Sequence, residues 1–110
     1  MRNDAERLTD ILEAITNIEK YAVKGKAEFQ KNELVQIWIV HHLQIIGEAS
    51  NNLSQEIREK YPNLSWAEII AFRNILVHEY FRIDLNVVWK IVERDLPNLK
   101  TKIELILEEN

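Results

Sequence analysis

The scarcity of turn-forming residues is the strongest constraint on how this chain can fold. Its 110 residues include two glycines and two prolines, whereas a β-sandwich or barrel needs turn residues at intervals of roughly ten positions. Hydrophobic residues make up 46% and charged residues 29% of the chain, which is the balance of a globular protein and not of a disordered one. We therefore predict an all-α fold, an antiparallel four- to five-helix bundle.

Several classes of protein are excluded by what the sequence lacks. The chain has no Cys, which rules out disulfides, zinc–thiolate sites and cysteine nucleophiles. Its longest apolar runs, 37–40 and 69–72, are four residues long, whereas a membrane helix needs about 20. The charged N-terminus does not resemble a signal peptide, so we expect a cytoplasmic protein without a membrane partner. Because the net charge is −4, a nucleic acid would have to bind at a local basic site.

Hydrophobic periodicity and capping residues predict the positions of the helices. Apolar residues at steps of three and four predict an amphipathic helix over 4–22, which Gly25 ends. A second helix is expected over about 31–52. The remaining signals are a short helix capped by Ser54 and ending at Lys60, a capping box from Ser65 to Glu68 that opens a third helix, and a fourth helix that Asp84 caps and Pro97 kinks or restarts.

The second predicted helix is apolar over much of its circumference. Its apolar residues are Leu34, Val35, Ile37, Trp38, Ile39, Leu43, Ile45, Ile46 and Ala49. An amphipathic helix needs only one apolar face in a bundle. We therefore expect the surplus apolar surface to contact a partner chain.

The three histidines are the side chains that titrate near neutral pH. His41 and His42 lie within the second predicted helix, and His41 is seven residues from Glu48 with the apolar Ile45 between them. That spacing lacks a third metal ligand. We therefore assign His41 and His42 to core or interface packing and predict no metal site.

His78 lies in a more reactive neighbourhood, the segment RNILVHEY at 73–80. On an ideal helix Arg73 and His78 would be about 140° apart, so they would act on one atom only if the helix loosened or if they came from different chains. Spacing alone is equally compatible with an ion pair at Arg73 and a helix C-terminus at His78, where an imidazolium is favoured. Tyr80 could likewise be a packing residue.

Several short motifs between Ile45 and Leu99 occur in a characteristic order. They are IIGEASNNLS at 45–54, YPNLSW at 61–66, RNILVHEY at 73–80, ID at 83–84, VVW at 87–89 and DLPNL at 95–99. The third contains an R-x4-H-x-Y signature without departure. Together they resemble the HepT-like branch of the HEPN domain superfamily, and they cover about half of the chain.

This resemblance implies a fold, an activity and roles for individual residues. It implies one HEPN domain over the whole chain, usually homodimeric, that acts as the toxin of a type VII HepT/MntA toxin–antitoxin system. The implied activity is a metal-independent ribonuclease in which Arg73 and His78 are catalytic. Asn74 and Glu48 would support them, and Tyr80 would be the residue to which the antitoxin transfers AMP.

The implied partners are an RNA substrate (tRNA or mRNA) and a nucleotidyltransferase antitoxin of the MntA type. The toxin would need no cofactor, and ATP would serve only as the AMP donor of the antitoxin. Concerted RNA cleavage uses two proton carriers, and a two-fold dimer would supply two copies of His78. The alternative is a non-catalytic HEPN dimer that binds a nucleotide or a partner. The antitoxin role is disfavoured because the chain lacks a GS-x-x-D-x-D signature.

Overall fold

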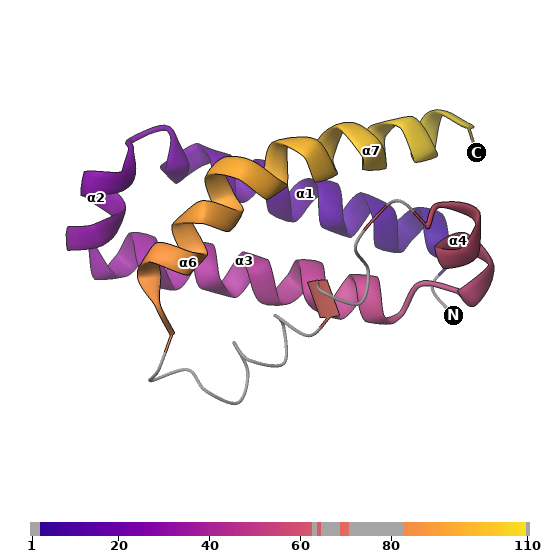
Figure 1. Ribbon diagram of the computed structural model, residues 1–110, viewed down its shortest axis with the longest axis horizontal. Coiled ribbons are helices and arrows are strands. Elements are labelled where there is room, and N and C mark those ends of the chain that lie inside the picture. Colours follow the sequence, from indigo (N-terminus) through magenta and orange to yellow (C-terminus); the bar gives the residue numbers. More distant parts are fainter. Residues whose placement is uncertain (1–2, 63, 65–68, 71–82, 110) are drawn as a thin grey trace.

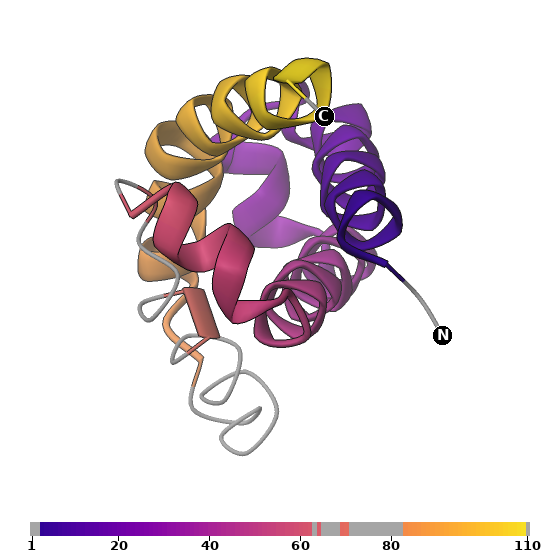
Figure 2. The same ribbon diagram turned by 90° about the vertical axis from the view of Figure 1, so that its right-hand side faces the viewer.

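The protein is helical, and no strand occurs in the residues that the structure describes. This computed structural model describes residues 3–62, 64, 69–70 and 83–109. Its helices are α1 (Asp4–Ala22), α2 (Lys26–Lys31), α3 (Glu33–Asn51), α4 (Gln55–Lys60), α6 (Leu85–Lys90), the π-helical turn η2 (Ile91–Asp95) and α7 (Leu96–Glu109). Figure 1 shows α1, α3 and α7 along the long axis of the bundle, which Figure 2 views from one end. The prediction of an all-α fold is confirmed.

Helix α1 begins and ends where the sequence predicts. Asn3 caps it, because its Oδ1 accepts a hydrogen bond from the Glu6 N–H at 2.9 Å. The apolar stripe, including Leu8 and Ile15, is buried in the core. Beyond the end of α1, Gly25 has a φ of +93°, a conformation that favours glycine. The chain can therefore turn sharply from α1 into α2.

Helix α3 packs antiparallel to α1, as Figure 1 shows. The Trp38 indole N–H donates to the main-chain oxygen of Asn17 at 2.7 Å. The ring of Tyr21 meets the Trp38 indole edge-on, with centroids 5.3 Å apart. On the inner face of α3, Ile39 and Ile46 are buried. Polar and apolar contacts together fix the register of α3 against α1.

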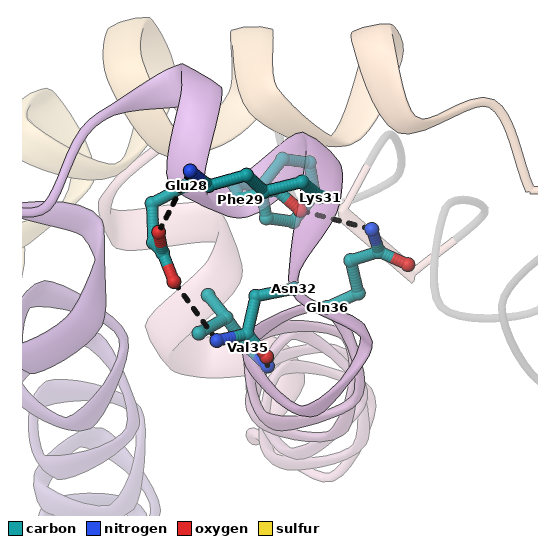
Figure 3. A network of polar contacts seen from close by, with 6 residues as sticks. All are labelled: Glu28, Phe29, Lys31, Asn32, Val35 and Gln36. Atoms are coloured by element: carbon teal, nitrogen blue, oxygen red, sulfur yellow. Dashed lines mark hydrogen bonds and ion pairs between the residues drawn. The ribbon is translucent and has the colours of Figure 1, made fainter.

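Helix α2 was not anticipated, because the apolar pattern predicts a single helix starting at about Lys31. The chain instead breaks at Asn32, which has φ −110° and ψ 104° and caps α3 by accepting from the N–H of Leu34 and Val35. The Asn32 amide also donates to Glu28 Oε1 at 2.9 Å, and the Gln36 amide donates to a carbonyl of α2. Figure 3 shows this network between α2 and α3. A six-residue helix held by such contacts leaves little periodicity in the sequence.

Helix α4 is capped by Ser54, as predicted. The Ser54 Oγ accepts from the Ile57 N–H at 3.2 Å and donates to Asp4 Oδ2 at 2.6 Å, while the Ser54 N–H donates to Asp4 Oδ1 at 2.9 Å. The beginnings of α1 and α4 are thereby linked. Across the short loop between α3 and α4, the Arg58 guanidinium donates to the carbonyl of Asn51, the last residue of α3, at 2.6 Å. It thus satisfies an otherwise unpaired acceptor at the end of α3.

Helices α6 and α7 are joined by the wide turn η2. Asp84 caps α6 by accepting from the Asn86 N–H at 2.8 Å, as predicted. In η2 the N–H of Leu96 donates to the carbonyl of Ile91, five residues earlier. Pro97 lacks an N–H, and its ring would collide with the carbonyl four residues before it in a regular helix. The turn therefore widens ahead of Pro97, where the sequence predicts an interruption.

The core lies between α1, α3 and α7, where Ile103 and Ile106 are almost fully buried. At its edge the Lys100 ammonium binds Glu19 Oε1 at 2.9 Å. This hydrogen bond and the charge of Glu19 raise the pKa of Lys100 above its ordinary value. Most of the third helix predicted from Ser65 lies outside the described residues, although Ile69 and Ile70 are helical. None of the described helices is long and apolar enough to cross a membrane.

Candidate active site

Four of the five candidate site residues, Arg73, Asn74, His78 and Tyr80, lie outside the described residues. The structure does describe residues before and after their segment. Before it, the side chain of Ile69 is partly buried and packs against the core, and Ile83 does the same after it. Asp84 then caps α6. The described residues on either side of the motif segment thus pack against the bundle or cap a helix of it.

Glu48 is the candidate residue that the structure does describe, and it lies near the end of α3 with its side chain exposed. Its main-chain oxygen accepts a hydrogen bond from the Asn52 amide at 2.9 Å. At 100° per residue, Glu48 shares a face of α3 with His41 and Ile37, and both are exposed as well. We call this set, together with Leu34, the outer face of α3.

Two residues of the outer face of α3, Leu34 and Ile37, have apolar side chains. Leu34 is 78% exposed and Ile37 is 43% exposed, and Ile45 is partly buried against the core. Exposed apolar side chains that occur together on one face are typical of an interaction surface. The predicted surplus of apolar surface on this helix is therefore confirmed, and its contact with a partner chain stays a prediction.

The adjacent histidines on α3 have different surroundings. His42 is 7% exposed, and its Nδ1 lies 2.8 Å from the carbonyl oxygen of Trp38. Its ring also stacks on the Trp38 indole with centroids 4.4 Å apart. The packing role predicted for His42 is thus confirmed. His41 is exposed, so it does not pack in the core of the chain, and an interface role for it remains a prediction.

The two tryptophans that the structure describes are packing residues. Trp89 is 7% exposed, and its ring centroid lies 5.3 Å from that of Phe29. Trp38 is partly buried between α1 and α3. Trp66 lies outside the described residues. Within the part of the chain that the structure describes, no group of three or more His, Cys, Asp or Glu side chains is arranged to hold a metal ion.

Comparison with known proteins identifies the family. A family model described as "Ribonuclease HepT-like" matches residues 11–106. The chain belongs to this HepT-like ribonuclease family. The match includes Glu48 and the motif segment 73–80. The resemblance seen in the motifs between Ile45 and Leu99 is therefore confirmed.

Individual relatives in the HepT-like family bear names that refer to ribonucleases. "Putative RNase MJ1380" from Methanocaldococcus jannaschii is 39% identical over 100 residues, which cover 90% of this chain and 92% of the relative. "Probable ribonuclease HepT" from Thermococcus cleftensis is 38% identical over 104 residues, 94% of each chain. "Gamma-glutamylcyclotransferase and putative RNase MJ0434", also from M. jannaschii, is 40% identical over 99% of this chain, which spans 50% of that longer protein. No solved structure matches this chain significantly.

Proposed function

We propose that this chain is a ribonuclease toxin that cuts RNA without a metal ion, through Arg73 and His78. The observation that carries the proposal is the HepT-like family match over residues 11–106, which contains an R-x4-H-x-Y signature at 73–80. Membership of this family supports ribonuclease activity in general. The assignment to Arg73 and His78 rests on the signature and on the chemistry of the two side chains.

The chemistry of RNA cleavage gives each residue a role. A base removes the proton from the 2′-hydroxyl, an acid protonates the leaving 5′-oxygen, and positive charge stabilises the pentacoordinate phosphate between them. The Arg73 guanidinium stays protonated and donates two hydrogen bonds to phosphate oxygens, so it fits the last role. His78 can exchange a proton near neutral pH. Asn74 and Glu48 would orient these groups or the RNA.

Because one motif supplies one imidazole, we propose that the site is shared by two chains. A two-fold dimer would bring two copies of His78 and two copies of Arg73 to one cleft. The outer face of α3 supports such a dimer, because Leu34 and Ile37 expose apolar surface there and the exposed Glu48 lies on the same face. Dimerisation through this face would place Glu48 near the interface.

Tyr80 would be the point of control by an antitoxin of the MntA type. In this step the Tyr80 hydroxyl oxygen attacks the α-phosphorus of ATP, and the bond between that phosphorus and the α–β bridging oxygen breaks. Pyrophosphate leaves, the phenolic proton passes to a base of the antitoxin, and AMP remains on Tyr80. The added phosphate is negative and the adenosine is bulky, so both would block the neighbouring phosphate site. We place toxin and antitoxin in the cytoplasm, with tRNA or mRNA as the substrate.

The active-site assignment is tested with Arg73→Ala and His78→Ala, compared with Arg94→Ala as a control. Arg94 is an exposed arginine in η2, outside the motif. We expect both motif variants to lose RNA cleavage in the presence of EDTA while keeping the circular dichroism spectrum and the dimer, and Arg94→Ala to cleave like the parent. Cleavage by either motif variant at the parental rate would refute the assignment.

A mixing experiment tests whether the site is composite. Chains with Arg73→Ala are combined with chains with His78→Ala, so that some dimers have one intact pair. Recovery of part of the activity is expected only if the two residues act across the dimer. If both motif variants keep parental RNA binding and the parent cuts no RNA, the non-catalytic binding module becomes the better description.

A further inference from the structure

The turn between α1 and α2 gathers three lysines on the surface. Lys20 lies in the last turn of α1, Lys24 follows the helix, and Lys26 begins α2. All three are exposed, and no Asp or Glu lies between Lys20 and Ala27. Gly25, with its positive φ, lies between Lys24 and Lys26, so the three lysines flank the connection between α1 and α2. We call Lys20, Lys24 and Lys26 the basic corner.

The acidic residues that flank the basic corner in the sequence are engaged elsewhere. Glu19 Oε1 binds the ammonium of Lys100 on α7 at 2.9 Å. Glu28 accepts a hydrogen bond from the Asn32 amide at 2.9 Å and lies 4.0 Å from Lys31 (Figure 3). These contacts leave the positive charge of the corner without a nearby acid from its own segment. The corner therefore presents concentrated positive charge to the solvent.

Helix stability explains only part of this arrangement. A cation at the end of a helix interacts favourably with the helix dipole, which suits Lys20 and Lys24 after α1. Lys24 also lies over the Tyr21 ring, 5.5 Å from its centroid. Lys26, in contrast, lies in the first turn of α2, where the dipole disfavours a positive charge. The fold therefore gains little from Lys26.

The opposite end of the bundle has the opposite character. On α4 the charges of Glu56 and Glu59 are balanced by Arg58 and Lys60, whereas α7 ends in the exposed Glu108 and Glu109, and Figure 1 shows α4 and the C-terminus at the end away from α2. The whole chain has a net charge of −4. A polyanion is therefore repelled by most of the surface, and the field of the protein directs it to the basic corner.

We propose that the basic corner binds the phosphate backbone of single-stranded RNA and holds the substrate through residues outside the R-x4-H-x-Y motif. This inference rests on the proposed ribonuclease function for the identity of the polyanion. Lysine binds phosphate as a point charge without reading the sequence of the RNA. Between Lys20 and Lys24, Val23 is 81% exposed and offers an apolar contact to a sugar or base. The corner thus contributes affinity and salt dependence, and it takes no part in the chemical step.

The test compares the parent with Lys20→Ala/Lys24→Ala/Lys26→Ala in binding a fluorescein-labelled single-stranded RNA, measured by anisotropy over a series of KCl concentrations. Each lost phosphate contact lowers the slope of log K against log salt by roughly 0.7. Loss of three contacts therefore makes the slope about 2 units less steep and weakens binding tenfold or more at low salt. The corresponding triple Arg variant keeps the charge and should bind like the parent.

Lys60→Ala is the matched control, because the Lys60 ammonium lies over the Tyr61 ring at 5.6 Å, nearly as Lys24 lies over Tyr21. It removes the same charge and the same kind of ring contact at the acidic end, and it should leave the salt slope unchanged. An equal loss of affinity in Lys60→Ala and in the triple Ala variant would overturn the proposal. An unchanged salt slope in the triple Ala variant would also overturn the proposal.

Cleavage kinetics separate this inference from the proposed function. We expect the triple Ala variant to raise KM for RNA about as much as it weakens binding, with kcat unchanged. If the parent cuts RNA and the variant has the parental KM, the inference fails and the ribonuclease stands. If the parent binds RNA through the corner without cutting it, the ribonuclease fails and the inference stands. Thermal unfolding adds a check, because a corner that served only the fold would lower the melting temperature without changing the salt slope.

Discussion

The exposed apolar side chains on the outer face of α3 allow a quantitative prediction about the proposed dimer. Leu34 is 78% exposed and Ile37 is 43% exposed in the single chain. Complete burial of such a side chain is worth about 1.5 kcal/mol at the lower end of the usual range. Scaled by the exposed fractions and counted on both chains, burial of these two residues contributes roughly 4 kcal/mol to association. That free energy corresponds to about a thousandfold in the dissociation constant.

We therefore expect Leu34→Gln/Ile37→Gln to dissociate the dimer at concentrations where the parent is paired. Both positions face the solvent in the single chain, and Gln is a good helix former, so the free energy of unfolding of the monomer should change little. Sedimentation velocity over a dilution series measures the dissociation constant. Urea denaturation followed by circular dichroism measures the stability of the chain.

The control is Leu105→Gln, because Leu105 is 52% exposed but belongs to α7 and not to α3. It should leave the dissociation constant at the parental value. The reasoning is refuted if the α3 variant pairs as tightly as the parent, if Leu105→Gln weakens the dimer equally, or if the parent is monomeric at every concentration. If the active site is composite, RNA cleavage by the α3 variant should also fall with dilution.

Three further predictions concern the contacts that hold the bundle together. Trp38→Phe removes the indole N–H that donates to α1 and should lower the free energy of unfolding by about 1 kcal/mol, seen as a lower urea midpoint with an unchanged m-value. Ser54→Ala removes the cap of α4 and its link to α1, and a loss of about 1–2 kcal/mol is expected in the same assay; an unchanged midpoint would contradict this. Glu19 raises the pKa of Lys100. The stabilisation of the folded state by this ion pair is therefore fully present below the unfolded pKa of about 10.4, and it is lost as the pH rises through the higher folded value. The stability difference between the parent and Lys100→Met should therefore shrink at strongly alkaline pH and at high salt, whereas a difference that grew with pH would contradict this assignment.

The parts of the fold that the sequence predicts well are those with strong local signals. The apolar stripe and flanking residues of α1 placed both of its ends, and the caps at Ser54 and Asp84 placed the beginnings of α4 and α6. At Ser54 and Asp84 a short polar side chain binds a main-chain N–H group within three residues. Such contacts depend on neighbouring residues only, so they are visible in the sequence.

The features that the sequence pattern missed depend on contacts between distant residues or on very short segments. The six residues of α2 are too few for a periodic pattern, and the break at Asn32 is stabilised by contacts to Glu28 and to the start of α3. The net charge of the whole chain likewise does not reveal the three lysines at Lys20, Lys24 and Lys26, because it averages over all residues. The gap in acidic residues from Lys20 to Ala27 is the signal that would have revealed them.

Most of the candidate site is predicted from the sequence alone, because the structure describes only Glu48 among its residues. Glu48 proved to be exposed on the outer face of α3, which helical periodicity already implies. The roles of Arg73, His78 and Tyr80 stay predictions, because their segment lies outside the described residues. Whether the side chains of a motif meet depends on the backbone between them and on a second chain. Neither can be derived from spacing along one sequence.

The wide turn η2 has a consequence for changes in chain length. A π-helical turn accommodates one residue more than a regular turn, and this surplus brings Val88 before it and Leu96 after it to the same buried side. Deleting one residue between Ile91 and Asp95 would therefore leave a regular turn, with Ile103 and Ile106 still facing the core. Adding one more residue there would instead rotate α7 by about 100° relative to α6 and move Ile103 and Ile106 away from the positions they occupy in the core.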